Sequence, residues 1–209
     1  MIPLTKTLDP ADWDDLAPEL ARVRAVGIGA QHDLREWEYS LALRALVTHR
    51  EHYPTPPADY LVLDVGGAGS TFSAMVTGPG VACKVVDPKI NKSIEQVSPV
   101  PPYALADAVV SISTIEHVKE PLPFLQACHR VLAPGGLLFL TFDYWNQSGP
   151  DTAMFHWMRE RIYNQLTWGL LAADCVAMGF QAFGETDVTY HGDHVYDYSF
   201  CSLALTKEA

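Results

Sequence analysis

The segment LVLDVGGAGS, residues 61–70, constrains the fold of this chain more than any other stretch. An apolar run leads through Asp64 to three glycines within four positions, Gly66, Gly67 and Gly69. This pattern predicts a buried strand that ends in a tight turn and opens a helix, because glycine has no Cβ and reaches positive φ at little cost. Backbone N–H groups at the start of a helix attract negative charge, and a ligand carboxylate is the group we expect there. The turn is therefore interpreted as a cofactor-binding loop.

The spacing of the glycines argues against two common nucleotide-binding loops. A dinucleotide fingerprint needs glycines at relative positions one, three and six, but counting from Gly66 this chain has Ala68 and Thr71 at the last two. A phosphate-binding Walker loop needs Lys followed by Ser or Thr after its last glycine, and no such pair follows Gly69.

Composition bounds the size, the compartment and the partners. The 209 residues are 48% apolar, which suffices for one α/β domain with a full core. The net charge is −11, the pI is about 5.0 and the 14 Lys and Arg residues are scattered, so we do not expect a nucleic-acid partner. The four cysteines stand singly in apolar runs, and we find neither a signal peptide nor about 18 consecutive apolar residues. We expect a cytoplasmic protein that does not span or bind a membrane.

Alternating strand and helix patterns fill most of the chain. Helical periodicity is expected over residues 12–24, 34–49, 121–132 and about 154–178, with a helical turn at 70–75. Strands are expected at 61–65, 82–86, 108–112, 137–142, 180–187 and 196–205. Such alternation predicts a parallel sheet with crossover helices, and the short loop between the last two strands predicts an antiparallel edge. Only nineteen residues separate Asp87 from Asp107, so a further strand between them must be short or absent.

The first fifty residues are interpreted as a helical preface. We divide the chain into a helical N-terminal extension or lid, residues 1–52, and an α/β domain, residues 53–209, which opens with the proline-rich connector YPTPPADY. Trp37 and Tyr39 are two positions apart on one predicted helix and cannot both face inward. We expect one of them to pack and the other to close over a ligand.

Two parts of the sequence together resemble the class I S-adenosylmethionine-dependent methyltransferases of small molecules. Residues 64–70, DVGGAGS, are similar to motif I of that family, an acidic residue followed by Gly-x-Gly-x-Gly, with Ala68 at the middle glycine position. Residues 107–145 are similar to its later motifs, an apolar strand, Glu116-His117-Val118, a helix, and Leu132-x-Pro134-Gly135-Gly136 before the next strand.

The resemblance implies a Rossmann-like three-layer α/β sandwich with a mostly parallel sheet and an antiparallel C-terminal strand. It implies S-adenosylmethionine as the methyl donor and S-adenosylhomocysteine as the product. It also places a set of residues around the donor, namely Asp64, Gly66, Gly67, Gly69, Ser113 and Thr114. The family's polar adenine contact has no clear match in residues 91–103, so we expect apolar groups such as Ile90 or Tyr103 to cover the ring.

Two carboxylates near the loop suggest how the donor is held. Asp87 ends the second strand 18 residues beyond Gly69, where a carboxylate can accept two hydrogen bonds from a ribose diol. Asp64 either orients the glycine loop through backbone N–H groups or reaches the methionine moiety through water.

The candidates for a catalytic base are His117, Asp143, Tyr144 and His191, and with them His194. His117 follows the fourth strand at the carboxyl end of the sheet, where open α/β sheets bind ligands, and histidine titrates near neutral pH. Asp143 and Tyr144 leave the fifth strand on the same rim. His191 belongs to the turn HGDH, whose two histidines could bind a metal, but nothing nearby completes a ligand shell and we predict no metal site.

The leading hypothesis is a cytoplasmic methyltransferase of a small molecule, with O-methylation of a sugar or another hydroxylated metabolite as its chemistry. The aromatic segment 146–163 and the helical preface are expected to roof the acceptor pocket. Two alternatives are a non-catalytic relative that binds the cofactor or a partner protein, and a nicotinamide-dependent oxidoreductase, against which the glycine spacing weighs. The oligomeric state is left open, with a homodimer as one option.

Overall fold

The fold is given by a computed structural model, which describes residues 3–28, 34–53, 59–99, 105–145, 154–155, 160–161, 163–189 and 199–208. Its helices in these ranges are α1 (Asp12–Asp15), α2 (Ala17–Val26), α3 (Arg35–His52), α4 (Phe72–Val76), α5 (Pro121–Val131) and α6 (Gln165–Ala177), with 3-10 turns η1 (Ile94–Gln96) and η2 (Ile115–His117). Its strands are β1 (Thr5–Lys6), β2 (Tyr60–Val65), β3 (Val81–Val86), β4 (Ala106–Ser111), β5 (Leu132–Trp145), β6 (Met154–Phe155), β7 (Glu160–Arg161), β8 (Tyr163–Asn164), β9 (Phe180–Ala182), β10 (Thr186–Asp187) and β11 (Ser199–Lys207). Within those ranges, no helix has both the length and the hydropathy needed to cross a membrane.

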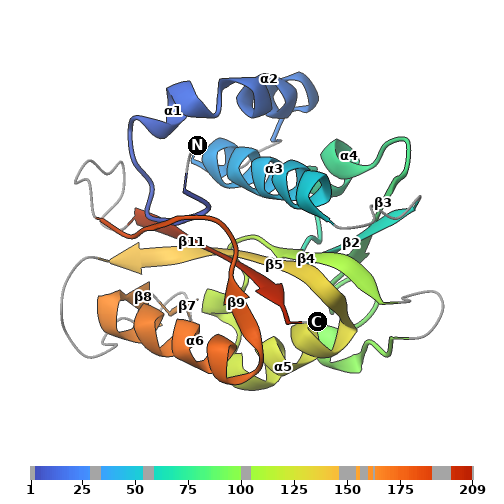
Figure 1. The fold of residues 1–209 in the computed structure, drawn as a ribbon, viewed down its shortest axis with the longest axis vertical. Helices are drawn as coiled ribbons and strands as arrows, with labels where there is room; N and C mark the ends of the chain where they lie inside the picture. The colour runs from blue at the N-terminus through green and yellow to red at the C-terminus, as the bar shows by residue number, and fades with distance from the viewer. Residues whose placement is uncertain are drawn as a thin grey trace.

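A mixed sheet in the order β3-β2-β4-β5-β11-β9 forms the centre of the molecule (Figure 1). β3, β2, β4 and β5 run parallel, whereas β11 runs antiparallel between β5 and β9. The predicted parallel sheet with an antiparallel C-terminal strand is thus confirmed, and β9, paired antiparallel with β11, forms the predicted antiparallel edge. From β2 the chain first adds β3 on one side and then crosses to β4 on the other. The strand order therefore reverses at β2, which is where open α/β sheets leave a crevice at their carboxyl ends.

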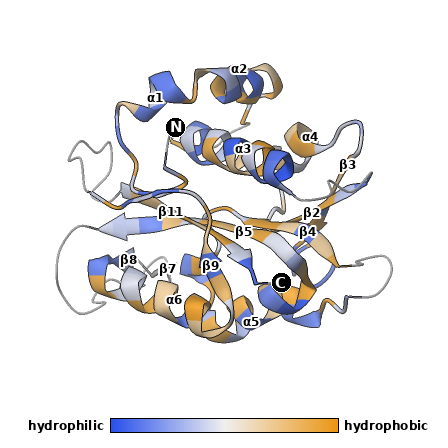
Figure 2. Ribbon diagram, in the orientation of Figure 1, coloured by the Kyte–Doolittle hydropathy of each residue, from blue (hydrophilic) through white to orange (hydrophobic). Residues whose placement is uncertain are grey.

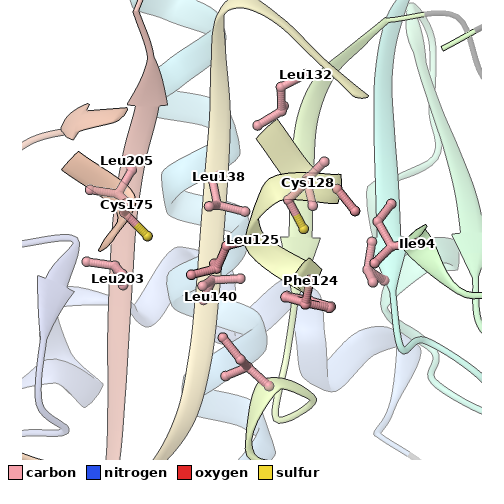
Figure 3. Packing of buried hydrophobic residues seen from close by; sticks show 14 of the residues in the cluster. Ile94, Phe124, Leu125, Cys128, Leu132, Leu138, Leu140, Cys175, Leu203 and Leu205 are labelled. Carbon is pink, nitrogen blue, oxygen red and sulfur yellow. The ribbon is translucent and has the colours of Figure 1, made fainter. Parts of the chain in front are cut away.

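Helices cover both faces of the sheet, which gives the expected three layers (Figure 1). The helices α1, α2, α3 and α4 lie on one face, and α5 and α6 lie on the other. Because side chains alternate along a strand, Val62 and Phe139 pack toward α3, whereas Leu63 and Leu138 pack toward α5. Figure 2 shows hydrophobic residues concentrated along the central strands. Figure 3 shows the hydrophobic core between the sheet and the helices α5 and α6, in which Leu138 packs with the buried thiols of Cys128 and Cys175.

The N-terminal residues are part of this sandwich. β1 pairs in parallel with β10, and the Ser202 hydroxyl of β11 donates to the Leu4 carbonyl at 2.8 Å. At the far end of α3, His49 lies 2.9 Å from the Gly135 carbonyl through Nε2 and 2.6 Å from the Tyr60 hydroxyl through Nδ1. Since a carbonyl can only accept, Nε2 carries the proton and Nδ1 accepts from the tyrosine. The division of the chain at residue 52 into an extension and a domain remains a prediction.

Two of the predicted helices differ in extent from the sequence expectations, each for a local reason. The helix expected over 12–24 is divided at Leu16, because Pro18 lies in the first turn of α2, where its missing N–H costs nothing. The helix expected from about 154 begins instead at Gln165, where the Asn164 side chain accepts from the backbone N–H groups of Leu166 and Thr167 at 3.0 and 2.9 Å. The described residues before it belong to β6, β7 and β8. Between β3 and β4 the described residues contain η1 and no strand, as the short spacing predicted.

Candidate functional site

The glycine loop follows β2, as predicted, and two of its glycines have steric reasons to be there. Gly66 has a φ of 84°, and a Cβ at this position would overlap the side chain of Thr114. A Cβ at Gly67 would overlap the carboxylate of Asp64. Gly69 also has a positive φ, 80°, but lies in open space. The side chains of Thr114 and Asp64 therefore take the space that a Cβ would need at Gly66 and Gly67, and only glycine fits at these two positions.

Asp64 is a buried carboxylate without a complete set of partners. It is 2% exposed, and its Oδ2 atom has no hydrogen-bond partner. Burial, and after it the negative charge of Asp87, raises the pKa of Asp64 to about 7. A buried acceptor of this kind is costly to leave unpaired, so it is suited to a ligand that donates a hydrogen bond or carries a positive charge.

Asp87 follows β3 directly and ties this strand to the glycine loop. Its Oδ2 accepts from the Ala68 N–H at 3.1 Å and its Oδ1 accepts from the Lys89 N–H at 2.7 Å. The side chain lines a cavity and is 6% exposed, so it does not turn outward to bulk solvent. Each carboxylate oxygen keeps a lone pair for a further donor.

A cavity of about 560 Å³ lies at the carboxyl ends of β2, β3 and β4. This volume is within the range of small-molecule sites. Four of the residues predicted to bind a cofactor line it, namely Gly66, Asp87, Ser113 and Thr114, and the base candidate His117 lines it too. Asp64, Gly67 and Gly69 belong to the same loop region but are not among its lining residues.

The expected apolar cover for an adenine ring is corrected in part. Ile90 is 60% exposed and does not line the cavity, because the turn after Asp87 directs it away from the sheet. Ile94 of η1 is 2% exposed and lines the cavity in its place, together with Val86 and Phe124. Tyr103 lies outside the described residues.

The segment after β4 is held in an uncommon conformation. Ser113 has a φ of 42°, and it is the one non-glycine residue with positive φ in the described part of the chain. Its N–H donates to the carbonyl of Thr141 at 3.2 Å and to the Oγ1 of Thr141 at 3.1 Å. Its hydroxyl donates to Oε1 of Glu38 on α3 at 2.6 Å, and the Thr141 hydroxyl donates to the same atom at 2.5 Å.

A cluster of charged side chains lies beside this segment, and sequence reasoning assigned a role to only one of them. Glu38 is fully buried, and its Oε2 lies 2.7 Å from Nη1 of Arg35. Glu116 is 2% exposed and its Oε2 has no partner. Burial, and after it the negative charge of Asp143, holds the pKa of Glu116 well above its usual range. The predicted base Asp143, 6% exposed, therefore belongs to a buried group of carboxylates with one guanidinium nearby.

One sequence signal could have identified Glu38. It stands in register with the buried Ala42, Ala45 and His49, at spacings of four, seven and eleven along the helix, so a charge occupies the apolar face of α3. Trp37 and Tyr39 are both buried, contrary to the expectation that the two could not both face inward. Both are covered because α3 is enclosed between the sheet and α1 with α2.

The remaining base candidates are separated by the fold. His117 is exposed at the cavity. Tyr144 points to the opposite face of β5 from Asp143 and lies in the core with Phe142 and Tyr163. His191 lies outside the described residues, as does His194. No group of three metal-ligating side chains is found among the residues that the structure describes.

Comparison with known proteins supplies a family. Residues 35–173 match the model of a family described as a methyltransferase domain. The chain is 29% identical over 119 residues to the mitochondrial ubiquinone biosynthesis O-methyltransferase of Mus musculus, and the match covers 46% of this chain and 32% of that protein. It is 31% identical over 100 residues to the ubiquinone biosynthesis O-methyltransferase of Xanthomonas campestris pv. campestris, and this match covers 38% of this chain and 41% of that protein. The chain thus spans less than half the length of these curated relatives.

Solved structures share the fold. The 1,6-didemethyltoxoflavin-N1-methyltransferase of Burkholderia thailandensis, with bound 1,6-didemethyltoxoflavin and S-adenosylhomocysteine, matches with a TM-score of 0.56 and 15% identity over 97% of this chain and 92% of that one. The N-methyltransferase NodS of Bradyrhizobium japonicum matches with a TM-score of 0.54 and 13% identity over 86% of this chain and 99% of that one. The [4+2]-cyclase SpnF matches with a TM-score of 0.52 and 17% identity over 95% of this chain and 94% of that one. At these identities the likeness concerns the fold, and the presence of a cyclase shows that the fold alone does not assign the reaction.

Proposed function

Because this chain belongs to the methyltransferase domain family, we propose that it transfers the methyl group of S-adenosylmethionine to a small-molecule acceptor. One observation carries the proposal. Gly66, which Thr114 approaches, and the Asp87 carboxylate line one cavity at the point where the strand order reverses, and Asp64, with its unpaired buried oxygen, belongs to the same loop region.

The residues present fit the donor by their chemistry. The Asp87 carboxylate is suited to accept hydrogen bonds from a ribose diol, and Ile94 and Phe124 supply apolar cover for a base. The unpaired Oδ2 of Asp64 is suited to the ammonium group of the methionine moiety. Gly66 lets the donor lie against the backbone, and Ser113 and Thr114 line the same cavity.

When bound, S-adenosylmethionine supplies an activated sulfonium methyl whose leaving group is a neutral thioether. The chain's own task is then to align the acceptor atom, exclude water and remove a proton where the acceptor has one. Alignment can contribute about 7–11 kcal/mol, whereas a general base adds roughly 10²–10⁴-fold. We assign the base to His117 at the cavity or to Asp143 in the buried carboxylate group, with Tyr144 and His191 as further candidates.

For the acceptor we propose a hydroxyl group of a sugar or another hydroxylated metabolite. Support comes from the curated relatives, whose names describe O-methyltransferases, and from the polar group formed by Glu38, Glu116 and Asp143 beside the cavity wall. We also propose that the protein is cytoplasmic and can form a homodimer. Cell fractionation would test the location, and light scattering would test the oligomeric state.

The test of the proposed function has two stages. Calorimetric titration with S-adenosylhomocysteine and, separately, with NAD comes first, and we expect micromolar binding of the former and none of the latter. Transfer of a tritiated methyl group to a panel of hydroxylated small molecules comes second. Binding of NAD alone would favour the oxidoreductase, and donor binding without transfer to any acceptor would favour a non-catalytic relative.

A further inference from the structure

Glu38 is an unusual group to find in the interior of this fold. Its carboxylate is fully buried on α3, far along the chain from the glycine loop and from the strand ends. Burying a charge is costly unless it is paired and hydrogen-bonded, and here Oε1 is hydrogen-bonded, whereas Oε2 is ion-paired without a hydrogen bond. Oε1 accepts from the hydroxyls of Ser113 and Thr141 at 2.6 and 2.5 Å, and Oε2 forms an ion pair with Arg35 at 2.7 Å.

The contacts of Glu38 converge on one strained residue. Ser113 has a φ of 42°, a left-handed conformation that residues with a Cβ adopt at a steric cost. Thr141 holds its N–H and Glu38 holds its hydroxyl, so side chain and backbone are both fixed. Thr141 also bonds directly to Glu38, which closes the triangle of these three residues. Strained backbone persists where the surroundings determine it in this way.

Ser113 forms part of the cavity wall, next to Thr114, which closes over Gly66. A change in the backbone of Ser113 would therefore move the wall that faces the glycine loop. The next residue of α3 reaches that loop as well, because the Tyr39 hydroxyl donates to the Ser70 hydroxyl at 3.0 Å. Through Glu38, α3 is attached to the cavity wall at Ser113, and through Tyr39 it is attached to the glycine loop at Ser70.

From these contacts we infer that Glu38 is a positioning residue for the donor cavity, which holds Ser113 in its left-handed conformation so that the wall is formed before the ligand arrives. The inference rests on the proposed function, since it assumes that the cavity takes an adenosyl donor. α3 is then a part of the binding site and not merely a cover over the sheet.

The experiment compares the effect of Glu38→Gln in two backgrounds. S-adenosylhomocysteine affinity is measured by calorimetry for the full chain, for Glu38→Gln, for Ser113→Gly and for the double variant. Glycine adopts positive φ without support, so it should no longer need Glu38. We expect Glu38→Gln to weaken binding about tenfold in the natural background, and by less than about threefold when residue 113 is glycine. Glu36→Gln, two positions away in a partly exposed ion pair with Arg24, is the matched control and should change affinity by less than about twofold.

Thermal unfolding separates positioning from general stability. Arg35 loses its charged partner in both Glu38→Gln variants, so the unfolding temperature should stay lowered in the double variant although its affinity recovers. An equal loss of affinity in both backgrounds, or recovery of affinity and unfolding temperature together, would overturn the inference. If Glu38→Gln does not fold, Thr141→Val replaces it in the same cycle, because it removes the hydroxyl that fixes both Ser113 and Glu38. Absence of binding by the natural chain would instead refute the proposed function, and the inference with it.

Discussion

Gly66→Ala tests the glycine cradle most sharply. Two costs follow from the structure. A φ of 84° costs a residue with a Cβ about 1–2 kcal/mol, and the added Cβ would overlap the Thr114 side chain, which at a packed site costs roughly 1–3 kcal/mol. Together these amount to about 2–5 kcal/mol. If the loop relaxes in the free protein and binding must restore it, the affinity for S-adenosylhomocysteine falls by at least about 30-fold, at 1.4 kcal/mol per decade.

Gly69→Ala is the matched control for this measurement. Gly69 has nearly the same φ, 80°, but a Cβ there meets nothing within 4 Å, so this variant carries the backbone cost without the overlap. Calorimetry should show weaker binding for Gly66→Ala than for Gly69→Ala by roughly 5- to 100-fold. Adding Thr114→Ala to Gly66→Ala removes the overlapping Oγ1 and Cγ2 atoms and should recover most of that difference. Equal affinities of the two single variants would refute the reasoning, because Thr114 would then not close over the loop.

Three further measurements address single side chains. Asp87→Asn should raise the calorimetric Kd for S-adenosylhomocysteine about 10- to 100-fold, since a charged hydrogen-bond acceptor contributes roughly 1.5–3 kcal/mol. Asp59→Asn changes an exposed carboxylate and is the control; equal Kd values for Asp87→Asn and Asp59→Asn would contradict the prediction. The raised pKa of Asp64 favours the protonated form in the folded state, so the free energy of unfolding of the unliganded chain should fall relative to Asp64→Asn as the pH rises from about 4 to about 7. Urea titrations across this range measure the difference, and parallel pH profiles would disprove it. His49→Leu should lower the free energy of unfolding by about 2–4 kcal/mol, since the Tyr60 hydroxyl and the Gly135 carbonyl each lose a hydrogen bond. A loss no larger than that of the exposed control His52→Leu would refute this role of His49.

The elements that local patterns control were predictable from the sequence. Strand β2 and the glycine loop follow from an apolar run and a cluster of glycines, and both are confirmed. The start of α6 was also encoded, because Asn164 and Thr167 form a capping box, but the periodicity of the preceding residues led to too early a start. The break at Leu16 likewise followed from Pro18, whose ring is tolerated in a first turn and not within a helix.

The pairing of distant side chains was not predictable in the same way. Asp87 follows its strand directly, so its place in the cavity could be inferred from spacing alone. Glu38 reaches Ser113 and Thr141 only because α3 packs across the ends of β4 and β5, and a single sequence holds no register between these elements. Ile94 replaces Ile90 in the cavity for a similar reason, since the direction of the turn after β3 decides which side chain faces inward.

The most direct test of the central claim is a crystal structure of the chain grown with S-adenosylhomocysteine. We predict the ligand in the cavity at the carboxyl ends of β2, β3 and β4, with its ribose hydroxyls on Asp87 and its backbone-facing side against Gly66. A ligand bound elsewhere, or a cavity that stays empty at saturating ligand, would contradict the claim.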